Sequence, residues 1–165
     1  MRLRANAHAL PVDSGGDPSL CVDTSAPLPT LRRMDVSDWD RFVKRGQREV
    51  KYVAHLPAYL NGLMLASSHQ IHIAHEYAVK AIIKHGLSIE HLPQISETLR
   101  NGEAIYDRPK HLTFFYLSPE FDRWFQVTIK CCSERRQLFV TTFHGMSPSD
   151  ITRKRKKFQQ VWPLT

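Results

Sequence analysis

The stretch that decides the fold is HLTFFYLSPEFDRWFQVTIKCCSERRQLFVTTFH, residues 111–144. Its middle part, 123–131, alternates apolar and polar side chains, and this period of two is typical of a half-buried strand. Residues 111–117 and 137–144 are rich in the aromatic and β-branched side chains that strands favour. The connections between the three segments are short, which favours antiparallel pairing. We therefore predict an antiparallel β-meander over this stretch.

The alternation also predicts which side chains face the core. The inward positions are Leu112, Phe114, Tyr116, Phe125, Val127, Ile129, Phe139 and Phe143. Val140 falls on the opposite, open face. The histidines, threonines and lysine on that face are His111, Thr113, Thr128, Lys130, Thr142 and His144. Such groups can transfer protons and bind phosphate. An ordinary half-exposed sheet face is the alternative, because threonine is common in strands.

Upstream of the meander, apolar residues recur with the 3.6-residue period of helices. We predict helices over about 37–56, 67–84 and 88–100, the first beginning in a capping box of Ser37 and Asp40. Helices first and an antiparallel sheet afterwards define an α+β fold. In this fold the N-terminal helices pack on one face of a meander of three to four strands.

The length of 165 residues suits one domain. Residues 1–35 are rich in proline and glycine and lack periodicity, so we predict a disordered or linker tail there and a single α+β domain over 36–165. No stretch approaches the ~20 apolar residues of a membrane span, so no membrane partner is expected. The three cysteines make a poor disulfide framework, which favours a reducing, cytoplasmic location.

Positive charge dominates the sequence. Lys and Arg number 23 against 16 Asp and Glu, and the formal net charge is +7. This surplus favours an anionic partner, either nucleic acid or an acidic protein. Five cations are consecutive in a C-terminal basic helix or tail: Arg153, Lys154, Arg155, Lys156 and Lys157. They could contact phosphates, form a solvated helix face or bind an acidic partner.

Histidines are the other candidate chemical groups. His69, His72 and His75 are spaced by three, which spreads them around a helix rather than along one metal-binding face. His75-Glu76 also lacks the second histidine of an HExxH motif. We therefore expect no metal and no other cofactor. His85 lies at a predicted helix C-terminus, where the helix dipole favours a protonated ring; simple capping is the alternative.

Short motifs follow one another along the second half of the chain. They are KHGLSIE at 84–90, LRNGE at 99–103, VTT at 140–142 and ITRKRKK at 151–157. In this order they resemble the small bacterial toxin domains of the barnase–EndoU–colicin–RelE group over about residues 67–157. The resemblance implies an RNA-cleaving, translation-inhibiting domain that works without metal. It also implies an acidic antitoxin or immunity protein as partner.

Carried over by position, the resemblance implies catalytic roles for His75, His85 and Thr142, and a basic contact at Arg108. Combined with the open face, it adds His144 as a second proton-transfer group. The predicted phosphate-binding residues are Arg108, His111, Lys130, Arg153, Lys154, Arg155, Lys156 and Lys157. The first hypothesis is a metal-independent endoribonuclease of toxin type. The second is a non-catalytic nucleic-acid-binding or regulatory subunit that uses the same basic surface.

Overall fold

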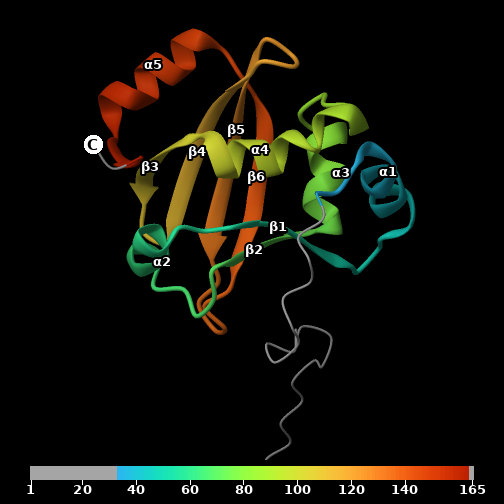
Figure 1. The fold of residues 1–165 in the computed structure, drawn as a ribbon, viewed down its shortest axis with the longest axis horizontal. Coiled ribbons are helices and arrows are strands. Elements are labelled where there is room, and N and C mark those ends of the chain that lie inside the picture. The colour runs from blue at the N-terminus through green and yellow to red at the C-terminus, as the bar shows by residue number, and fades with distance from the viewer. Residues whose placement is uncertain (1–32, 164–165) are drawn as a thin grey trace, which may run out of the picture. The chain divides into compact units, whose positions relative to one another are not determined.

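Helices and strands alternate along the chain before the predicted meander begins (Figure 1). The computed structural model describes residues 33–163, so most of the predicted tail at 1–35 lies outside the described residues. The helices are α1 (Val36–Arg45), α2 (Ala58–Met64), α3 (His75–Ile83), α4 (Gln94–Asn101) and α5 (Pro148–Lys157), with a 3₁₀ turn η2 (Ile89–His91). The strands are β1 (Val50–His55), β2 (Gln70–Ala74), β3 (Glu103–Arg108), β4 (His111–Ser118), β5 (Arg123–Cys131), β6 (Leu138–Met146) and β7 (Gln159–Trp162).

The sheet is larger than predicted and mixed. Its seven strands lie in the order β1-β2-β6-β5-β4-β3-β7. The predicted strands are present as β4, β5 and β6 and pair antiparallel. The expected toxin-like meander of three to four antiparallel strands is nevertheless wrong, because four further strands extend it and β2 pairs with β6 in parallel. The sheet is strongly curled. In Figure 1, β1 and β2 run roughly horizontally, whereas β4, β5 and β6 run roughly vertically.

The predicted first helix is too long. α1 ends at Arg45 and its C-cap is Gly46, where a Cβ would collide with the carbonyl oxygen and ring of Phe42. The later apolar residues of the expected stripe, Val50 and Val53, belong to β1, as suits their β-branched side chains. The N-cap is also displaced from Ser37, because the carboxylate of Asp35 accepts the backbone N–H of Asp38 at 2.9 Å.

The predicted second helix is divided between β2 and α3. Ile71 and Ile73 are fully buried while their neighbours are half-buried, which is the period of a strand. Ile71 and Ala74 fit a helical stripe as well, and this ambiguity conceals the strand in the sequence. The predicted third helix begins at Ser88, but as the 3₁₀ turn η2; Pro93 then precedes α4.

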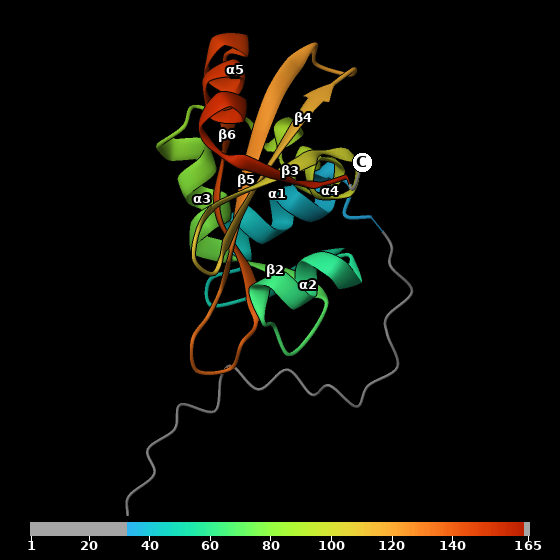
Figure 2. The ribbon, with the colours of Figure 1, turned by 90° about the vertical axis from the view of Figure 1, so that its left-hand side faces the viewer.

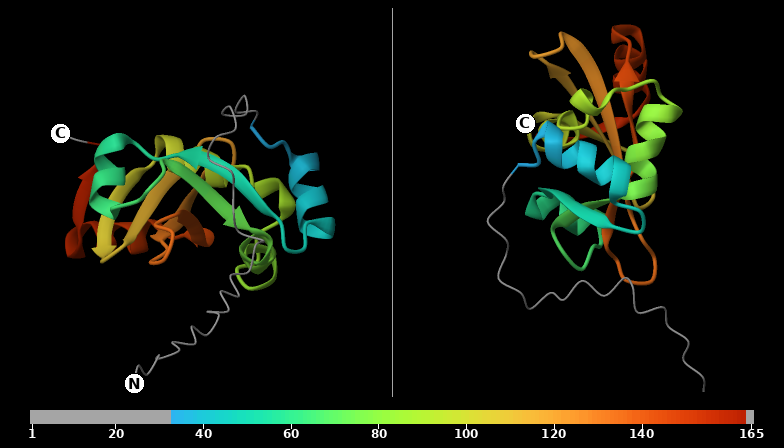
Figure 3. Two further views of the ribbon diagram at one scale, coloured as in Figure 1. Left: turned by 90° about the horizontal axis from the view of Figure 1, so that it is seen from below. Right: turned by 90° about the vertical axis from the view of Figure 1, so that its right-hand side faces the viewer.

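Two apolar cores lie on the two faces of the sheet. The larger joins α1, α3 and α4 to the sheet and includes the fully buried Trp39, Ile95 and Phe114. The smaller lies under α5, where Ile151 packs with Ile105 and Phe115. Figures 2 and 3 show α5 on the opposite side of the sheet from α1 and α4. The N-terminal helices α1, α3 and α4 thus share the main core, but the expectation that the opposite face is open is wrong, because α5 covers part of it.

A β-bulge in β6 changes the predicted facing of that strand. Thr128 pairs with Thr142 and Ile129 pairs with Val140, so Thr141 is an extra residue. Phe143 and Val140 are consequently both buried in the core, whereas Phe139 is half-buried on the other face. The predictions for Phe139 and Val140 are wrong, because strict alternation takes no account of a bulge.

Candidate functional site

Two histidines from distant parts of the chain meet beside β6. His85 follows the C-terminal end of α3, and His144 lies on β6. Their ring centroids are 5.3 Å apart with an angle of 37° between the rings. β2 pairs with β6 only near Leu138 and Phe139, and α3 packs against β6. The fold therefore places two groups able to exchange protons near neutral pH beside each other. We call them the histidine pair.

Positive charges surround His85. Burial lowers the pKa of His85, and the charges of His144, Lys80 and Lys84 lower it further. Both lysines come from α3 or its C-cap, so the same segment that carries His85 keeps its ring neutral. A neutral imidazole is a proton acceptor, and the nearby ammonium groups can attract an anion.

Hydrogen bonds define the free ring nitrogens of the pair. Nδ1 of His144 lies 2.9 Å from the carbonyl oxygen of Gly145. Because a carbonyl only accepts, Nδ1 donates, and Nε2 is left to exchange protons with a ligand. Nε2 of His85 is buried and has no hydrogen-bond partner among residues 33–163. No described residue therefore fixes whether this nitrogen carries a hydrogen, and the ring can accept or donate a proton.

A buried polar cluster lies next to the histidine pair on the same sheet face. Gln126 donates to Thr128 at 3.3 Å, and the Thr128 and Thr113 hydroxyl oxygens are 3.0 Å apart. Thr113 in turn donates to Asp107 at 3.3 Å. Burial lowers the pKa of Lys154 on α5, and Asp107 partly opposes this. The threonines predicted for an open face thus form a packed network that stabilises the sheet under α5.

Thr142 shares a strand and a face with His144. It lies directly opposite Thr128 and is half-buried. The structure therefore brings three of the four predicted catalytic residues, His85, Thr142 and His144, to one part of the molecule.

The fourth, His75, lies elsewhere. It begins α3, whose axis extends about 12 Å from His75 to Ile83 at ~1.5 Å per residue, and His85 follows the far end of that helix. Its Nε2 donates to the carbonyl oxygen of Val43 at 2.9 Å, and its ring meets Phe42 edge-on at 5.7 Å. These contacts give His75 a structural role in joining α1 to α3.

The basic run lies on α5 and its members differ in their surroundings. Arg155 donates to both carboxylate oxygens of Glu103, and its guanidinium lies 5.3 Å from the Trp124 ring centroid. Arg153 pairs with Asp150 at 2.5 Å. Lys154 is half-buried over the Phe115 ring, at 5.8 Å. Lys156 and Lys157 are exposed and pair with no carboxylate in the described part of the chain.

The other predicted phosphate contacts lie toward the far end of the same face. Lys130 is exposed on β5 and pairs with His111 of β4, which in turn pairs with Arg108 of β3. Nδ1 of His111 donates to the carbonyl oxygen of Pro109 at 2.9 Å. The three residues are thus neighbours, but they are separated from His144 along the strands.

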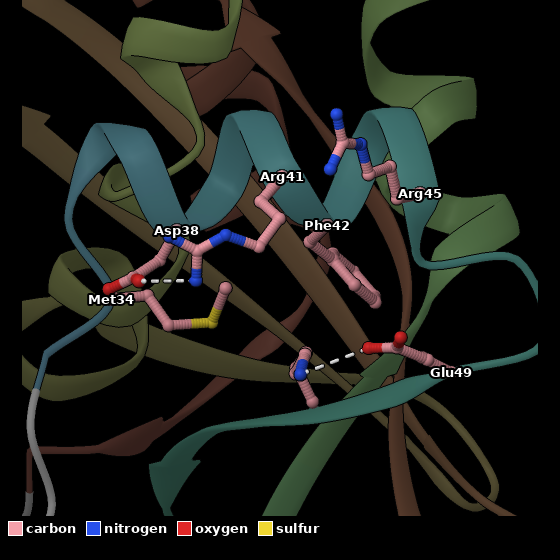
Figure 4. Close-up of a pocket in the computed structure, with 7 residues that line it drawn as sticks. Met34, Asp38, Arg41, Phe42, Arg45 and Glu49 are labelled. Carbon is pink, nitrogen blue, oxygen red and sulfur yellow. Dashed lines mark ion pairs between the residues drawn. The ribbon is translucent and has the colours of Figure 1, made fainter.

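A pocket lies between α1 and the start of β1 (Figure 4). Its lining charges largely neutralise each other, because Asp38 pairs with Arg41 at 3.7 Å and Glu49 with Lys51 at 3.0 Å. The residues that line it include no histidine, cysteine or serine. It offers neither a nucleophile nor a proton-transfer pair.

Within residues 33–163, no group of histidine, cysteine or acidic side chains is arranged to hold a metal ion. None of the described helices is both long and apolar enough to cross a membrane. Comparison with known proteins gives no match: no family model matches the chain, and no curated protein and no solved structure is significantly similar to it.

Sequence reasoning missed the polar residues Asp107 and Gln126, and the aromatic residues of β1 and β2. Asp107 lies in β3, which no alternation in the sequence predicts. Strand alternation puts Gln126 on the open face as an ordinary solvent-facing residue, whereas it is only 5% exposed. The alternation in QIHIA, residues 70–74, is the signal that could have revealed β2.

Proposed function

We propose that this protein is a metal-independent endoribonuclease whose histidine pair cleaves RNA by acid–base chemistry. The 5.3 Å approach of His85 and His144 is the observation that carries the proposal. Two proton-transfer groups this close can serve the two oxygens of one phosphodiester. The net charge of +7 and the lysines beside His85 favour the approach of a polyanion.

His85 acts as the base in this proposal, because its lowered pKa keeps the ring neutral. It takes the proton of a ribose 2′-hydroxyl as the 2′-oxygen forms a bond to phosphorus. The bond from phosphorus to the 5′-oxygen breaks, and His144, as the general acid, gives a proton from Nε2 to that leaving oxygen. The products are a 2′,3′-cyclic phosphate and a free 5′-hydroxyl. In this proposal Thr142 and Lys84 contact the phosphate and stabilise its negative charge.

The cellular setting follows from the same proposal. Cys131 and Cys132 are free thiols, which suits action in the reducing cytoplasm. We propose that an acidic antitoxin or immunity protein binds the lysines beside His85 and so keeps RNA away from the histidine pair.

The test is cleavage of an unstructured RNA by the purified protein in the presence of a chelator. His85→Ala and His144→Ala should each lower the cleavage rate by about 10²–10⁴-fold, the usual loss for a general acid or base. His75→Leu is the matched control, since His75 stands at the other end of α3. The proposal fails if the parent protein does not cleave RNA, or if both alanine variants cleave as fast as the parent.

A second candidate function is RNA binding without cleavage. It is favoured by the burial of Nε2 of His85, which keeps this nitrogen from solvent in the unbound protein. This candidate predicts salt-sensitive RNA binding that survives both alanine substitutions, and intact RNA at the end of the incubation.

A further inference from the structure

A row of side chains crosses the sheet outside the small core under α5. It takes one residue from each of six neighbouring strands, β1, β2, β6, β5, β4 and β3 (Figure 1). The members are Tyr52, His72, Phe139, Lys130, His111 and Arg108, and each is directly opposite the next in the strand pairing. We call this set the cross-strand row. At ~4.8 Å between strands it extends for about 24 Å over the curled sheet.

The cross-strand row faces away from the main core. Phe139 lies between the fully buried Leu138 and Val140, and Lys130 lies between the buried Ile129 and Cys131. Side chains alternate along a strand, so Phe139 and Lys130 point to the opposite face. None of the six residues belongs to the small core under α5, and Lys130 and Arg108 are exposed. The other four residues are half-buried, so this part of the face is partly accessible in the part of the chain that the structure describes.

One half of the cross-strand row is aromatic. The Tyr52 and His72 ring centroids are 6.1 Å apart, and those of His72 and Phe139 are 6.0 Å apart. Burial lowers the pKa of His72, so its ring is neutral at pH 7 and offers a π-surface rather than a charge. A half-buried phenylalanine directed away from the core, next to two other rings, provides the flat apolar surface on which nucleobases stack.

The other half of the row is cationic. Lys130 and Arg108 flank His111, and the row contains no carboxylate. The change from rings to cations across one sheet face suits a ligand with flat apolar groups and repeated negative charges. Nucleic acid has both, and its base faces are accessible only where the strand is unpaired.

We propose that the cross-strand row binds single-stranded RNA, with bases stacked on Tyr52, His72 and Phe139 and phosphates on Lys130 and Arg108. This rests on the proposed function, because it names the form of RNA that reaches the histidine pair. Gln126, which lies opposite His144, is four residues from Lys130 along β5, a distance of about 13 Å. RNA held by the row thus lies on the same sheet face as His144 of the histidine pair.

The test measures the affinity of His144→Ala for a labelled unstructured RNA and for a duplex of the same length. Phe139→Leu or Tyr52→Leu, added to that variant, should weaken single-strand binding by about 5-fold or more, since a stacked base contributes ~1–3 kcal/mol. Lys130→Gln should reduce the slope of log affinity against log salt by ~0.7. Tyr59→Leu on α2 is the matched control for a ring, because Tyr59 is 47% exposed outside the row. Thermal melting checks that each variant is folded; Lys130→Gln replaces an exposed side chain and carries the test if a ring variant unfolds.

The proposal is overturned if the ring and lysine variants bind single-stranded RNA as the parent does, or if the protein prefers the duplex. A different set of results is expected if the row binds RNA but the proposed ribonuclease function is wrong. In that case the parent chain binds single-stranded RNA through the row, the row variants bind it more weakly, and the RNA is never cleaved. Absence of cleavage alone would therefore not contradict the proposal that the cross-strand row binds single-stranded RNA.

Discussion

At the scale of single residues, the fold gives four histidines different surroundings. His85 and His144 have ring nitrogens without protein partners among residues 33–163 and lie beside each other. His75 donates to a backbone carbonyl and packs on Phe42, and His72 is neutral among other rings. The same side chain thus serves proton transfer, helix packing or stacking according to its neighbours.

The surroundings of His85 predict a pH dependence. Burial and the charges of His144, Lys80 and Lys84 lower the pKa of His85 below the ordinary histidine pKa of 6.5. As the pH rises, His85 therefore becomes a neutral base, and cleavage increases, at a pH below 6.5. Lys84→Gln removes one of these charges and should move this acidic limb of the pH–rate profile to higher pH. Lys44→Gln on α1 is the matched control and should leave it in place. An acidic limb that does not move in Lys84→Gln would exclude His85 as the base.

Thr142 tests whether a hydroxyl contacts the phosphate. Thr142→Val keeps the shape but removes the donor, so we expect cleavage to fall by about 10- to 100-fold, the value of a hydrogen bond to a charged group. Thr142→Ser retains the hydroxyl and should keep most of the rate. Equal rates in the valine and serine variants would show that the hydroxyl has no part in the reaction.

His75 should matter for stability alone. His75→Leu leaves the Val43 carbonyl without its donor, so the free energy of unfolding should fall by about 1 kcal/mol. Urea unfolding measures this fall, and the cleavage rate of the folded variant should match the parent. A large fall in cleavage with unchanged stability would restore His75 to the catalytic group.

At the scale of elements, α5 combines packing with charge. Ile151 buries its side chain in the small core, and Arg155 is held by Glu103 and Trp124. The helix begins at Ser147, whose hydroxyl accepts the backbone N–H of Asp150 at 3.2 Å. The basic run is therefore part of a docked helix, and its cations are not equivalent for RNA binding.

This difference predicts separate effects along α5. Replacing Lys156 and Lys157 by Gln should flatten the plot of log RNA affinity against log salt by ~0.7 for each phosphate that the variant no longer neutralises. Arg155→Gln breaks the pairing with Glu103, so it should lower the unfolding free energy and leave the salt slope nearly unchanged. Salt titrations and urea unfolding of the two variants separate these effects. The reverse pattern would mean that Arg155 is the residue that binds RNA.

At the scale of the whole molecule, local patterns predict β4, β5 and β6 but not the sheet that contains them. The alternation in 123–131 is clean because one face of β5 packs Phe125, Val127 and Ile129 into the main core while the other face carries polar side chains. β1 and β2 join the sheet through the long-range pairing of β2 with β6, and their apolar residues fit a helical stripe equally well. The bulge at Thr141 has no sequence signal that alternation could detect.

The candidate site is partly predictable for the same physical reasons. His144 and Thr142 follow from the alternation of β6, and His85 from the helix that ends before it. Their approach to one another depends on α3 packing against β6, which no local pattern encodes. The cross-strand row is not predictable, because Tyr52 and His72 lie in the segments whose apolar residues also fit the helical period.

The most direct measurement of the central claim is the chemistry of the RNA ends. The purified full chain is incubated with an unstructured RNA in chelator, and the fragments are analysed by mass spectrometry. We predict 2′,3′-cyclic phosphate and 5′-hydroxyl ends that are absent with His85→Ala and with His144→Ala. Intact RNA, or 3′-hydroxyl and 5′-phosphate ends, would contradict cleavage by the histidine pair.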